Sequence, residues 1–283
     1  GRFMRAYGTF EQPNPYGGYL GLTLPLAAGL AAAWLLGIGR RFSARWLALA
    51  LGCGALMLAA LVMSWSRGAW LGFGAALTGM ALAAAVRSGR GAVLTVALLV
   101  ILAYVLLTGG AAALPPSVVA RFSDVLPQLG LAGFEDVRGA EITDANFAVL
   151  ERMAHWQSAL AMWSDHPWLG IGIGNYEPAY GRYALPLWPS PLGHAHNFYR
   201  NIAAEAGLLG LLAYLILWAL AIFGAWQAAR KASGWCFGVT LGILGVLVHL
   251  SVHNTFDNLY VHNMYIQLAI LLALLGGRFW ETS

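Results

Sequence analysis

Residues 194–207 read His-Ala-His-Asn-Phe-Tyr-Arg-Asn-Ile-Ala-Ala-Glu-Ala-Gly. This stretch ends a long polar segment and leads into an apolar run that reaches about Ala228. Such a run is long enough to cross the hydrocarbon core of a bilayer, which takes roughly 20 residues. The junction therefore places two imidazoles, an amide and a carboxylate at a membrane surface. Which other groups share the membrane side of His196 then decides what the chain can do.

The composition is that of an integral membrane protein. Of the 283 residues, 59% are hydrophobic and 10% are charged, whereas a soluble domain carries about 25% charged residues. The apolar runs are continuous, which predicts spanning helices and not strands. The net charge of +4 is small and the basic residues cluster between apolar runs, so nucleic-acid binding is not expected. Cys53 and Cys236 lie in predicted spans and are expected to be free thiols.

Seven apolar runs divide the chain into three parts. The predicted spans are about 17–37, 46–65, 69–86, 92–112, 202–228, 235–252 and 259–276. Residues 1–114 thus hold an external N-terminal stretch and four spans, residues 115–201 form one large loop, and residues 202–283 hold three spans. Within the loop, apolar positions between Asn146 and Ser164 recur at a spacing near 3.6, which predicts a helix. The expected fold is an all-α integral membrane protein with about seven transmembrane helices.

The basic residues predict which connections lie outside the cell membrane. Cytoplasmic connections carry an excess of Lys and Arg, and alternate connections contain Arg40, Arg41 and Arg45, then Arg87 and Arg90, then Arg230 and Lys231, then Arg278. The N-terminal stretch, Arg67, the large loop and the turn at 253–262 are therefore external. The external arginines and histidines are Arg2, Arg5, Arg67, Arg121, Arg138, Arg152, Arg182, Arg200, His155, His166, His194, His196, His253 and His262. Arginine against the topological bias indicates a polyanionic substrate, because guanidinium binds phosphate oxygens in a bidentate fork.

Three of these arginines are candidates for substrate binding. Arg67 lies between two spans with almost no loop, so its charge must lie at or just below the interface, where an ionisable residue indicates a functional site. The alternative is an arginine that extends to the interface and bonds to helix carbonyls. Arg152, one helical turn before His155, and Arg5, ahead of Gly8, allow a functional role or a solvated surface position.

The histidines near the junction allow two interpretations. As half of a zinc site, His194 and His196 need a further ligand, which His155, His166, His253 or His262 could supply. As a general base, the His196 imidazole could take a proton from a hydroxyl near neutral pH, with Asn197 or Glu205 orienting the site. We favour the base over the metal, with a polar helix-start residue as the structural alternative. Asp257, in the last external turn, could fix a histidine or an arginine.

The glycine-rich stretch Gly170–Asn175 does not follow an apolar strand, so dinucleotide binding is not expected there. Its interpretation is a tight turn after Asp165-His166-Pro167.

These residues resemble the O-antigen ligase family of bacterial membrane glycosyltransferases, which also includes O-antigen polymerases and protein oligosaccharyltransferases. The family signature is His-(Asn/Ser/Asp)-x-x-Leu, six further residues and Gly. Here His196 and Asn197 begin it and Gly207 ends it at the family spacing, while Arg200 stands where Leu is usual. The stretches Ser66–Gly68, Asp165–Asn175 and Gly8–Asn14 are also similar, so the resemblance covers most of the chain. Members are usually longer, and we expect further helices upstream of Gly1.

The resemblance implies a GT-C-like fold in the bacterial cytoplasmic membrane, with the large loop external. It implies transfer of a glycan from a polyprenyl-diphosphate carrier to a hydroxyl of a lipid or glycan acceptor, with inversion and without a metal or other cofactor. Arg67 and Arg152 would hold the diphosphate and His196 would deprotonate or position the acceptor hydroxyl. Further substrate contacts are expected from Arg5, His194, Asn197, Arg200 and Asp257. External aromatic residues could stack on sugars or form an interfacial belt, namely Trp156, Trp163, Trp168, Tyr176, Tyr180, Tyr183 and Trp188.

Two other classes of function stay open at this point. A non-catalytic membrane subunit or lipid-binding scaffold derived from the family would explain the departure at Arg200, and it would have other membrane proteins as partners. A zinc-dependent membrane hydrolase would use the histidines as ligands. Membrane lipids are expected partners in every case.

Overall fold

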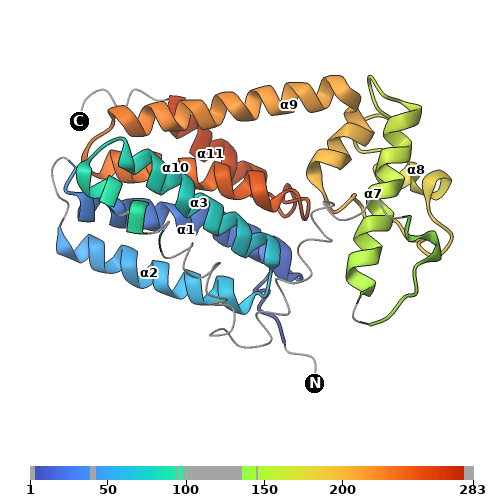
Figure 1. Ribbon diagram of the computed structural model, residues 1–283, viewed down its shortest axis with the longest axis horizontal. Coiled ribbons are helices and arrows are strands. Elements are labelled where there is room, and N and C mark those ends of the chain that lie inside the picture. The colour runs from blue at the N-terminus through green and yellow to red at the C-terminus, as the bar shows by residue number, and fades with distance from the viewer. Residues whose placement is uncertain are drawn as a thin grey trace. The chain divides into compact units, whose positions relative to one another are not determined.

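The computed structural model describes residues 4–38, 43–93, 95–97, 100, 136–144 and 146–276. Every regular element among these residues is a helix, which confirms the all-α prediction for them (Figure 1). The elements are α1 (Pro13–Leu36), α2 (Ala44–Met63), α3 (Arg67–Ala85), the 3-10 turn η2 (Val137–Gly139), α7 (Phe147–Asp165), α8 (Tyr176–Tyr183), α9 (Phe198–Lys231), α10 (Gly234–His253) and α11 (Met264–Gly276).

Five of the described helices, α1, α2, α3, α9 and α10, are long and apolar enough to cross a membrane. Each overlaps one of the seven predicted spans. The predicted span 92–112 lies largely outside the described residues. The last prediction, 259–276, begins too early, because α11 starts only at Met264 and is described over 13 residues. The preceding His262 and Asn263 have φ values of 50° and 60°, which a continuous helix does not accommodate.

The chain forms two compact units, and each is described by itself. The first consists of Gly1–Val119, Trp218–His253 and Leu259–Ser283, and the second of Ala120–Leu217 and Asn254–Asn258. The helix α9 contributes to both. The second unit therefore combines the external loop of the prediction with the start of α9 and with a five-residue segment from the turn before α11.

Small residues bring the helices of the first unit close together. The helix α10 packs against α1 and α3, and a Cβ atom on Gly29 of α1 would lie 2.2 Å from the carbonyl oxygen of Gly238 in α10. A Cβ atom on Gly242 would lie 2.7 Å from Cα of Leu26. Glycine is favoured at such crossings because lipid removes the hydrophobic drive and leaves backbone packing to hold helices together.

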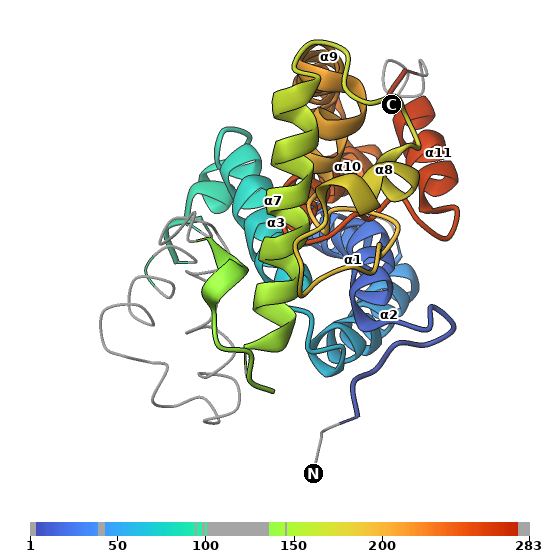
Figure 2. The same cartoon turned by 90° about the vertical axis from the view of Figure 1, so that its right-hand side faces the viewer.

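The second unit is built around α7 and α8, which pack against each other (Figure 2). Tyr176 and Tyr180 lie on one face of α8 and are buried in the same cluster as Ala159 and Met162 of α7. Both tyrosine side chains are fully enclosed. This core fixes the position of His155, which lies on α7 within the same packed region.

Candidate active site

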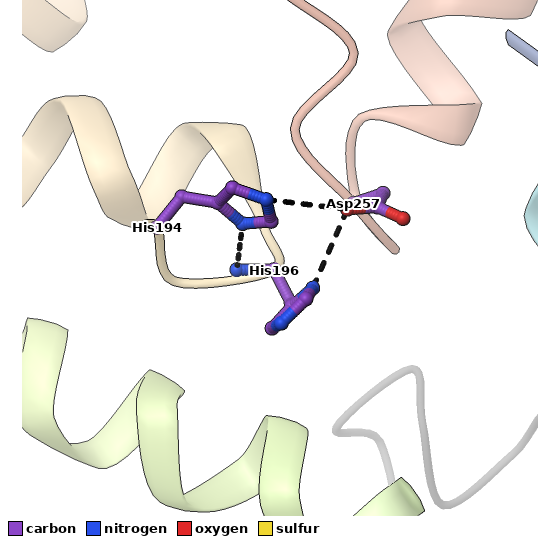
Figure 3. A group of neighbouring side chains, drawn as sticks. All are labelled: His194, His196 and Asp257. Atoms are coloured by element: carbon purple, nitrogen blue, oxygen red, sulfur yellow. Dashed lines mark hydrogen bonds and ion pairs between the residues drawn. The ribbon is translucent and has the colours of Figure 1, made fainter. Parts of the chain in front are cut away.

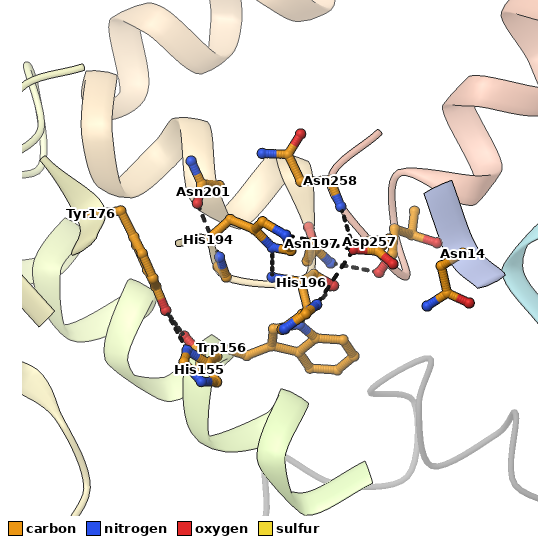
Figure 4. Close-up of polar contacts among 12 residues, drawn as sticks. Asn14, His155, Trp156, Tyr176, His194, His196, Asn197, Asn201, Asp257 and Asn258 are labelled. Carbon is orange, nitrogen blue, oxygen red and sulfur yellow. Dashed lines mark hydrogen bonds and ion pairs between the residues drawn. The ribbon is translucent and has the colours of Figure 1, made fainter. Parts of the chain in front are cut away.

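The loop before α9 is held by two asparagine side chains. Asn201 Oδ1 accepts a hydrogen bond from the Ala195 N–H at 3.0 Å (Figure 4). Asn197 Oδ1 accepts one from the Arg200 N–H, also at 3.0 Å. Asn197 Nδ2 also donates to the Thr255 carbonyl at 2.9 Å. An amide that caps the first turn of a helix satisfies one of its orphan donors, and here the same amide ties the loop to the segment that contains Asp257.

The His196 backbone is held in a strained conformation. Its φ of 49° lies in the left-handed region, which costs a residue other than glycine about 1–3 kcal/mol and is concentrated at functional sites. The His196 N–H donates to His194 Nδ1 at 3.1 Å, and the His196 carbonyl accepts from Trp156 Nε1 at 3.4 Å. The loop therefore presents the imidazole in one fixed direction.

One carboxylate orients the His196 ring. His196 Nδ1 lies 3.4 Å from Asp257 Oδ1, and Asp257 is buried (Figure 3). The Asn258 N–H donates to the same oxygen at 2.9 Å. His196 Nε2 is buried and has no hydrogen-bond partner among the described residues. A ring that donates from Nδ1 to a carboxylate leaves the Nε2 lone pair free, which is the arrangement of a general base.

Asp257 stays ionised in these surroundings. Burial by itself raises the pKa of a carboxyl group, but the hydrogen bond from His196 and the electrostatic interactions with His196, His194 and Arg152 outweigh it and hold the pKa of Asp257 well below its usual range. The carboxylate is therefore available to stabilise an imidazolium on His196. The sequence indicates that Asp257 could fix a histidine or an arginine, and in the structure its carboxylate contacts His196.

His155 lies edge-on to His196, with ring centroids 5.7 Å apart. Its Nδ1 is 3.0 Å from the Tyr176 hydroxyl, and this hydroxyl donates to the His155 carbonyl at 3.2 Å, so the imidazole Nδ1 must be the donor of the pair. Burial, followed by the charges of His196 and His194, lowers the pKa of His155 to about 4. His155 is therefore a neutral spacer at neutral pH.

Arg152 and Arg200 bring positive charge to this site. Arg152 of α7 acts electrostatically on both Asp257 and His194. The Arg200 guanidinium lies 4.2 Å from the centroid of the Trp156 ring, a cation–π contact. Trp156 in turn donates to the His196 carbonyl, so Trp156 connects the residue that replaces the usual leucine to the His196 backbone.

The second unit thus gathers six of the eight predicted site residues, namely Arg152, His194, His196, Asn197, Arg200 and Asp257. The other two, Arg5 and Arg67, belong to the first unit. Arg67 is the first residue of α3, which is capped by Ser66 Oγ at 3.4 Å from the Ala69 N–H. The Arg5 guanidinium donates to the carbonyl oxygens of Ser64 and Trp65 at 2.9 and 3.2 Å, and so holds the turn that precedes Arg67.

The backbone geometry explains why the family signature ends in a glycine, which is Gly207 here. Gly207 interrupts α9 with φ 66° and ψ −167°, a conformation open essentially only to glycine. The N–H groups of Leu208 and Leu209, which a regular helix directs one turn back, donate instead to the Pro167 and Trp168 carbonyls at 2.8 and 3.2 Å. A Cβ atom on Gly207 would lie 2.3 Å from the Trp168 carbonyl.

The glycine-rich stretch supplies the donors for the α9 carbonyls that this break releases. The released carbonyls of Ala204 and Glu205 accept hydrogen bonds from the N–H groups of Ile171 and Gly172, both at 2.9 Å. Gly170 has φ 67°, and a Cβ atom there would lie 2.3 Å from the Glu205 carbonyl carbon. The predicted structural role of this stretch is confirmed. It satisfies backbone groups that a break in an apolar helix would otherwise leave unpaired.

Two expectations about neighbouring residues need correction. Glu205 does not orient His196, because its Oε1 accepts from the Tyr176 N–H at 3.0 Å at the start of α8. Of the aromatic residues proposed to stack on sugars, Trp156, Tyr176, Tyr180 and Trp188 are buried. Tyrosine and tryptophan side chains carry large apolar area, and here that area forms the core of the loop.

The hydrogen bonds around His194 do not fit a metal site, although His194, His196 and Asp257 offer three atoms within 4.8 Å of one another. His194 Nδ1 accepts from a backbone N–H, so the proton of the neutral ring lies on Nε2, the nitrogen that faces Asp257. A metal-bound histidine normally keeps a proton on its other ring nitrogen and donates it outward. If His194 Nε2 bound a metal, it would lose its proton while Nδ1 still carried none. His194 would then have to bind as an imidazolate, which is unfavourable.

Comparison with known proteins agrees with the resemblance seen in the sequence. The sequence model of a family described as O-antigen ligase matches residues 52–215, more than half of the chain. This region contains Arg67, Arg152, His196 and Gly207, whereas Asp257 lies beyond it. No curated protein matches the chain. With several helices that can span a membrane and a family match of this extent, the chain belongs to the O-antigen ligase family, a family of membrane enzymes that handle glycans.

Proposed function

We propose that the protein transfers a glycan from a polyprenyl-diphosphate carrier to an acceptor hydroxyl on the outer face of the bacterial cytoplasmic membrane. The observation that carries this proposal is the Asp257–His196 pair, with a buried and unpartnered Nε2 on the imidazole. The alternation of basic residues along the chain supports the external placement of this pair.

The reaction needs only one base and a bound diphosphate. His196 Nε2 takes the proton of the acceptor hydroxyl as its oxygen attacks the anomeric carbon of the donor. The bond from that carbon to the diphosphate oxygen breaks on the opposite face, so the configuration inverts and the carrier diphosphate leaves with the electron pair. Asp257 stabilises the imidazolium that forms, which is the role of a carboxylate paired to a catalytic histidine.

The arginines stabilise the leaving group. Negative charge grows on the diphosphate in the transition state, and fixed donors aimed at that charge lower the barrier without a metal. Arg67 and Arg152 are assigned to the diphosphate, with Arg200 beside the acceptor. Arg5 acts through the turn that it holds at Ser64 and Trp65, because its guanidinium donates to these two carbonyls.

The membrane arrangement that goes with this activity has seven spans in this chain and a GT-C-like fold. Residues 1–114 would contribute the external N-terminal stretch and four spans, residues 115–201 the external loop, and residues 202–283 three spans. The five described spanning helices support this arrangement. A lipid or a growing glycan is the acceptor class, and neighbouring membrane proteins would deliver it.

The test is transfer by the purified protein in EDTA, from a synthetic polyprenyl-diphosphate oligosaccharide to a hydroxyl acceptor. We expect product from the wild type, and a fall in kcat/KM on the order of a hundredfold for Arg67→Ala and Arg152→Ala, since each removes a donor to the developing charge. The matched control is Arg182→Ala, an exposed arginine of α8, which should keep the wild-type rate. If folded wild type transfers no glycan with or without EDTA, the non-catalytic scaffold is favoured. If it transfers glycan without EDTA and not in its presence, a metal-dependent enzyme is favoured.

A further inference from the structure

The His194 side chain contacts the His196 backbone and the Asp257 carboxylate, which indicates a role other than direct substrate binding. Its side chain is 19% exposed, and its ring lies edge-on to His196 at a centroid distance of 4.4 Å. Its Nδ1 accepts the hydrogen bond from the His196 N–H at 3.1 Å. Its Nε2 lies 4.0 Å from Asp257 Oδ1, the same oxygen that binds His196.

These contacts fix the protonation state of the ring. Nδ1 can accept only if it carries no proton, so the neutral ring has its proton on Nε2, directed toward the Asp257 carboxylate. The geometry copies a turn in which an Asn or Asp side chain accepts from the N–H two residues later. The left-handed φ of His196 is the backbone conformation that this bond helps to hold.

The surroundings keep His194 neutral. Burial lowers the pKa of His194 to about 4, with Asp257 acting against it and the charges of His196 and Arg152 adding to it. His155, on the α7 side, is also electrostatically coupled to His194. If His194 took up a second proton, its Nδ1 would become a donor facing the His196 N–H and the hydrogen bond would be lost.

We propose that His194 is a positioning residue, which acts as the neutral Nε2–H tautomer and uses its Nδ1 lone pair to hold the His196 backbone in its left-handed conformation. The inference rests on the proposed function of His196 as base. The two histidines then divide the work: His196 takes the proton of the acceptor, while His194 fixes the direction from which His196 reaches it. A carboxylate shared by both rings links the two tasks.

The first test observes the tautomer directly and does not depend on activity. Imidazole nitrogen NMR of the full-length, histidine-labelled protein in lipid bilayers distinguishes protonated from unprotonated ring nitrogens, and the signals lost in His194→Asn identify His194. At pH 7 we expect Nδ1 without a proton and Nε2 with one. A protonated Nδ1 at pH 7 would overturn the proposal, whether or not the protein transfers glycans.

The second test uses a matched pair of substitutions in the transfer reaction. In His194→Asn, the amide Oδ1 is bonded to Cγ and can replace Nδ1 as the acceptor. His194→Phe keeps an aromatic ring at this position but removes the acceptor. We expect His194→Asn to retain most of the wild-type kcat, and His194→Phe to lose on the order of tenfold to a hundredfold, because a misplaced catalytic group costs about that much. Thermal unfolding of both variants checks that they are folded.

The outcomes separate the two proposals. Equal loss in both variants, at equal thermal stability, would show that His194 acts through more than its acceptor and would overturn the positioning role. Full activity of His194→Phe would overturn it as well. If folded wild type transfers no glycan, the proposed function of the family member fails, and the tautomer measured by NMR still decides whether His194 holds the His196 backbone.

Discussion

The pair His194 and His196 and the pair His249 and His253 differ in their partners, and the difference separates the proposed active site from a helix-packing site. In the second unit, His196 lies against the buried Asp257 and keeps one ring nitrogen unpartnered. In the first unit, His249 of α10 lies 3.3 Å from His253, and its ring fills the space left by Gly21 of α1. A Cβ atom on Gly21 would lie 1.9 Å from His249 Nε2.

The comparison shows that burial alone does not make a base. Each ring has one buried nitrogen without a hydrogen-bond partner among the described residues, but of the two only His196 contacts a described carboxylate, which sets its tautomer and can stabilise its protonated form. His249 instead joins α10 to α1 and α3, since Gly72 of α3 also leaves room for its ring. Its contacts are those of a helix-packing residue.

The largest expected effect comes from removing the carboxylate. Asp257→Asn keeps the shape of the side chain and loses the charge that stabilises the imidazolium. We therefore expect kcat to fall by a factor of between about 10² and 10⁴. The control is Asp165→Asn, an exposed carboxylate that accepts from the Tyr183 hydroxyl at 3.0 Å. In parallel, His249→Gln should lower stability and leave the rate per folded molecule unchanged. A comparable loss of rate in His249→Gln would erase the distinction between the two pairs.

The next effect concerns the backbone that supports the site. Gly207→Ala forces a Cβ atom against the Trp168 carbonyl and a left-handed φ on alanine, and we expect a loss of at least about 3 kcal/mol. Thermal unfolding measures it. Gly224→Ala is the matched control in the same helix, because nothing lies within 4 Å of its Cβ position. That change should be neutral or stabilise by up to about 1 kcal/mol. Equal behaviour of the two variants would contradict the kink geometry.

A third effect is the response of stability to acid. His155 and His194 have a folded pKa of about 4 against 6.5 for an unperturbed histidine. The unfolded chain therefore binds more protons between these values, and the stability present above pH 6.5 should fall as the pH drops toward 4. Thermal unfolding at closely spaced pH values checks this. A melting temperature that stays constant across the window would show that neither ring is buried in its neutral form.

The smallest expected effect tests the departure from the family signature. Arg200→Leu restores the usual residue and removes a cation–π contact worth roughly 0.5–2 kcal/mol. We expect a modest loss of stability and a change in kcat/KM of no more than about tenfold, since Trp156 keeps its bond to the His196 carbonyl. Arg200→Lys is the comparison, because lysine stacks less well on an indole. A complete loss of transfer in Arg200→Leu would place Arg200 on the substrate itself.

Much of the fold could be predicted from the sequence, because spanning helices follow from run length and hydropathy alone. The start of α11 could not be predicted, because no pattern in residues 259–263 indicates that His262 and Asn263 adopt a left-handed conformation before the helix begins. The helix break at Gly207 was also hidden: an apolar run reads as continuous, and only the crossing of Pro167–Gly172 shows where its backbone bonds go.

The site was predictable where its residues are adjacent in sequence. The spacing from His196 to Gly207 carried the family, and the matched region includes it. The sequence indicates only that Asp257 could fix a histidine or an arginine. The choice of His196 could not be predicted, because 61 residues separate the two side chains and an isolated aspartate in a turn has many uses. The role of His194 depends on one hydrogen bond to a neighbouring backbone, which no pattern of residue types encodes.

The central claim is that His196, held by Asp257, takes the proton of the acceptor. Its most direct test is the rate of glycan transfer in EDTA by His196→Ala beside His166→Ala, an exposed histidine of the same unit. We predict that His196→Ala loses at least about a hundredfold, the usual contribution of a general base, and that His166→Ala transfers like the wild type. Wild-type transfer by folded His196→Ala would contradict the account.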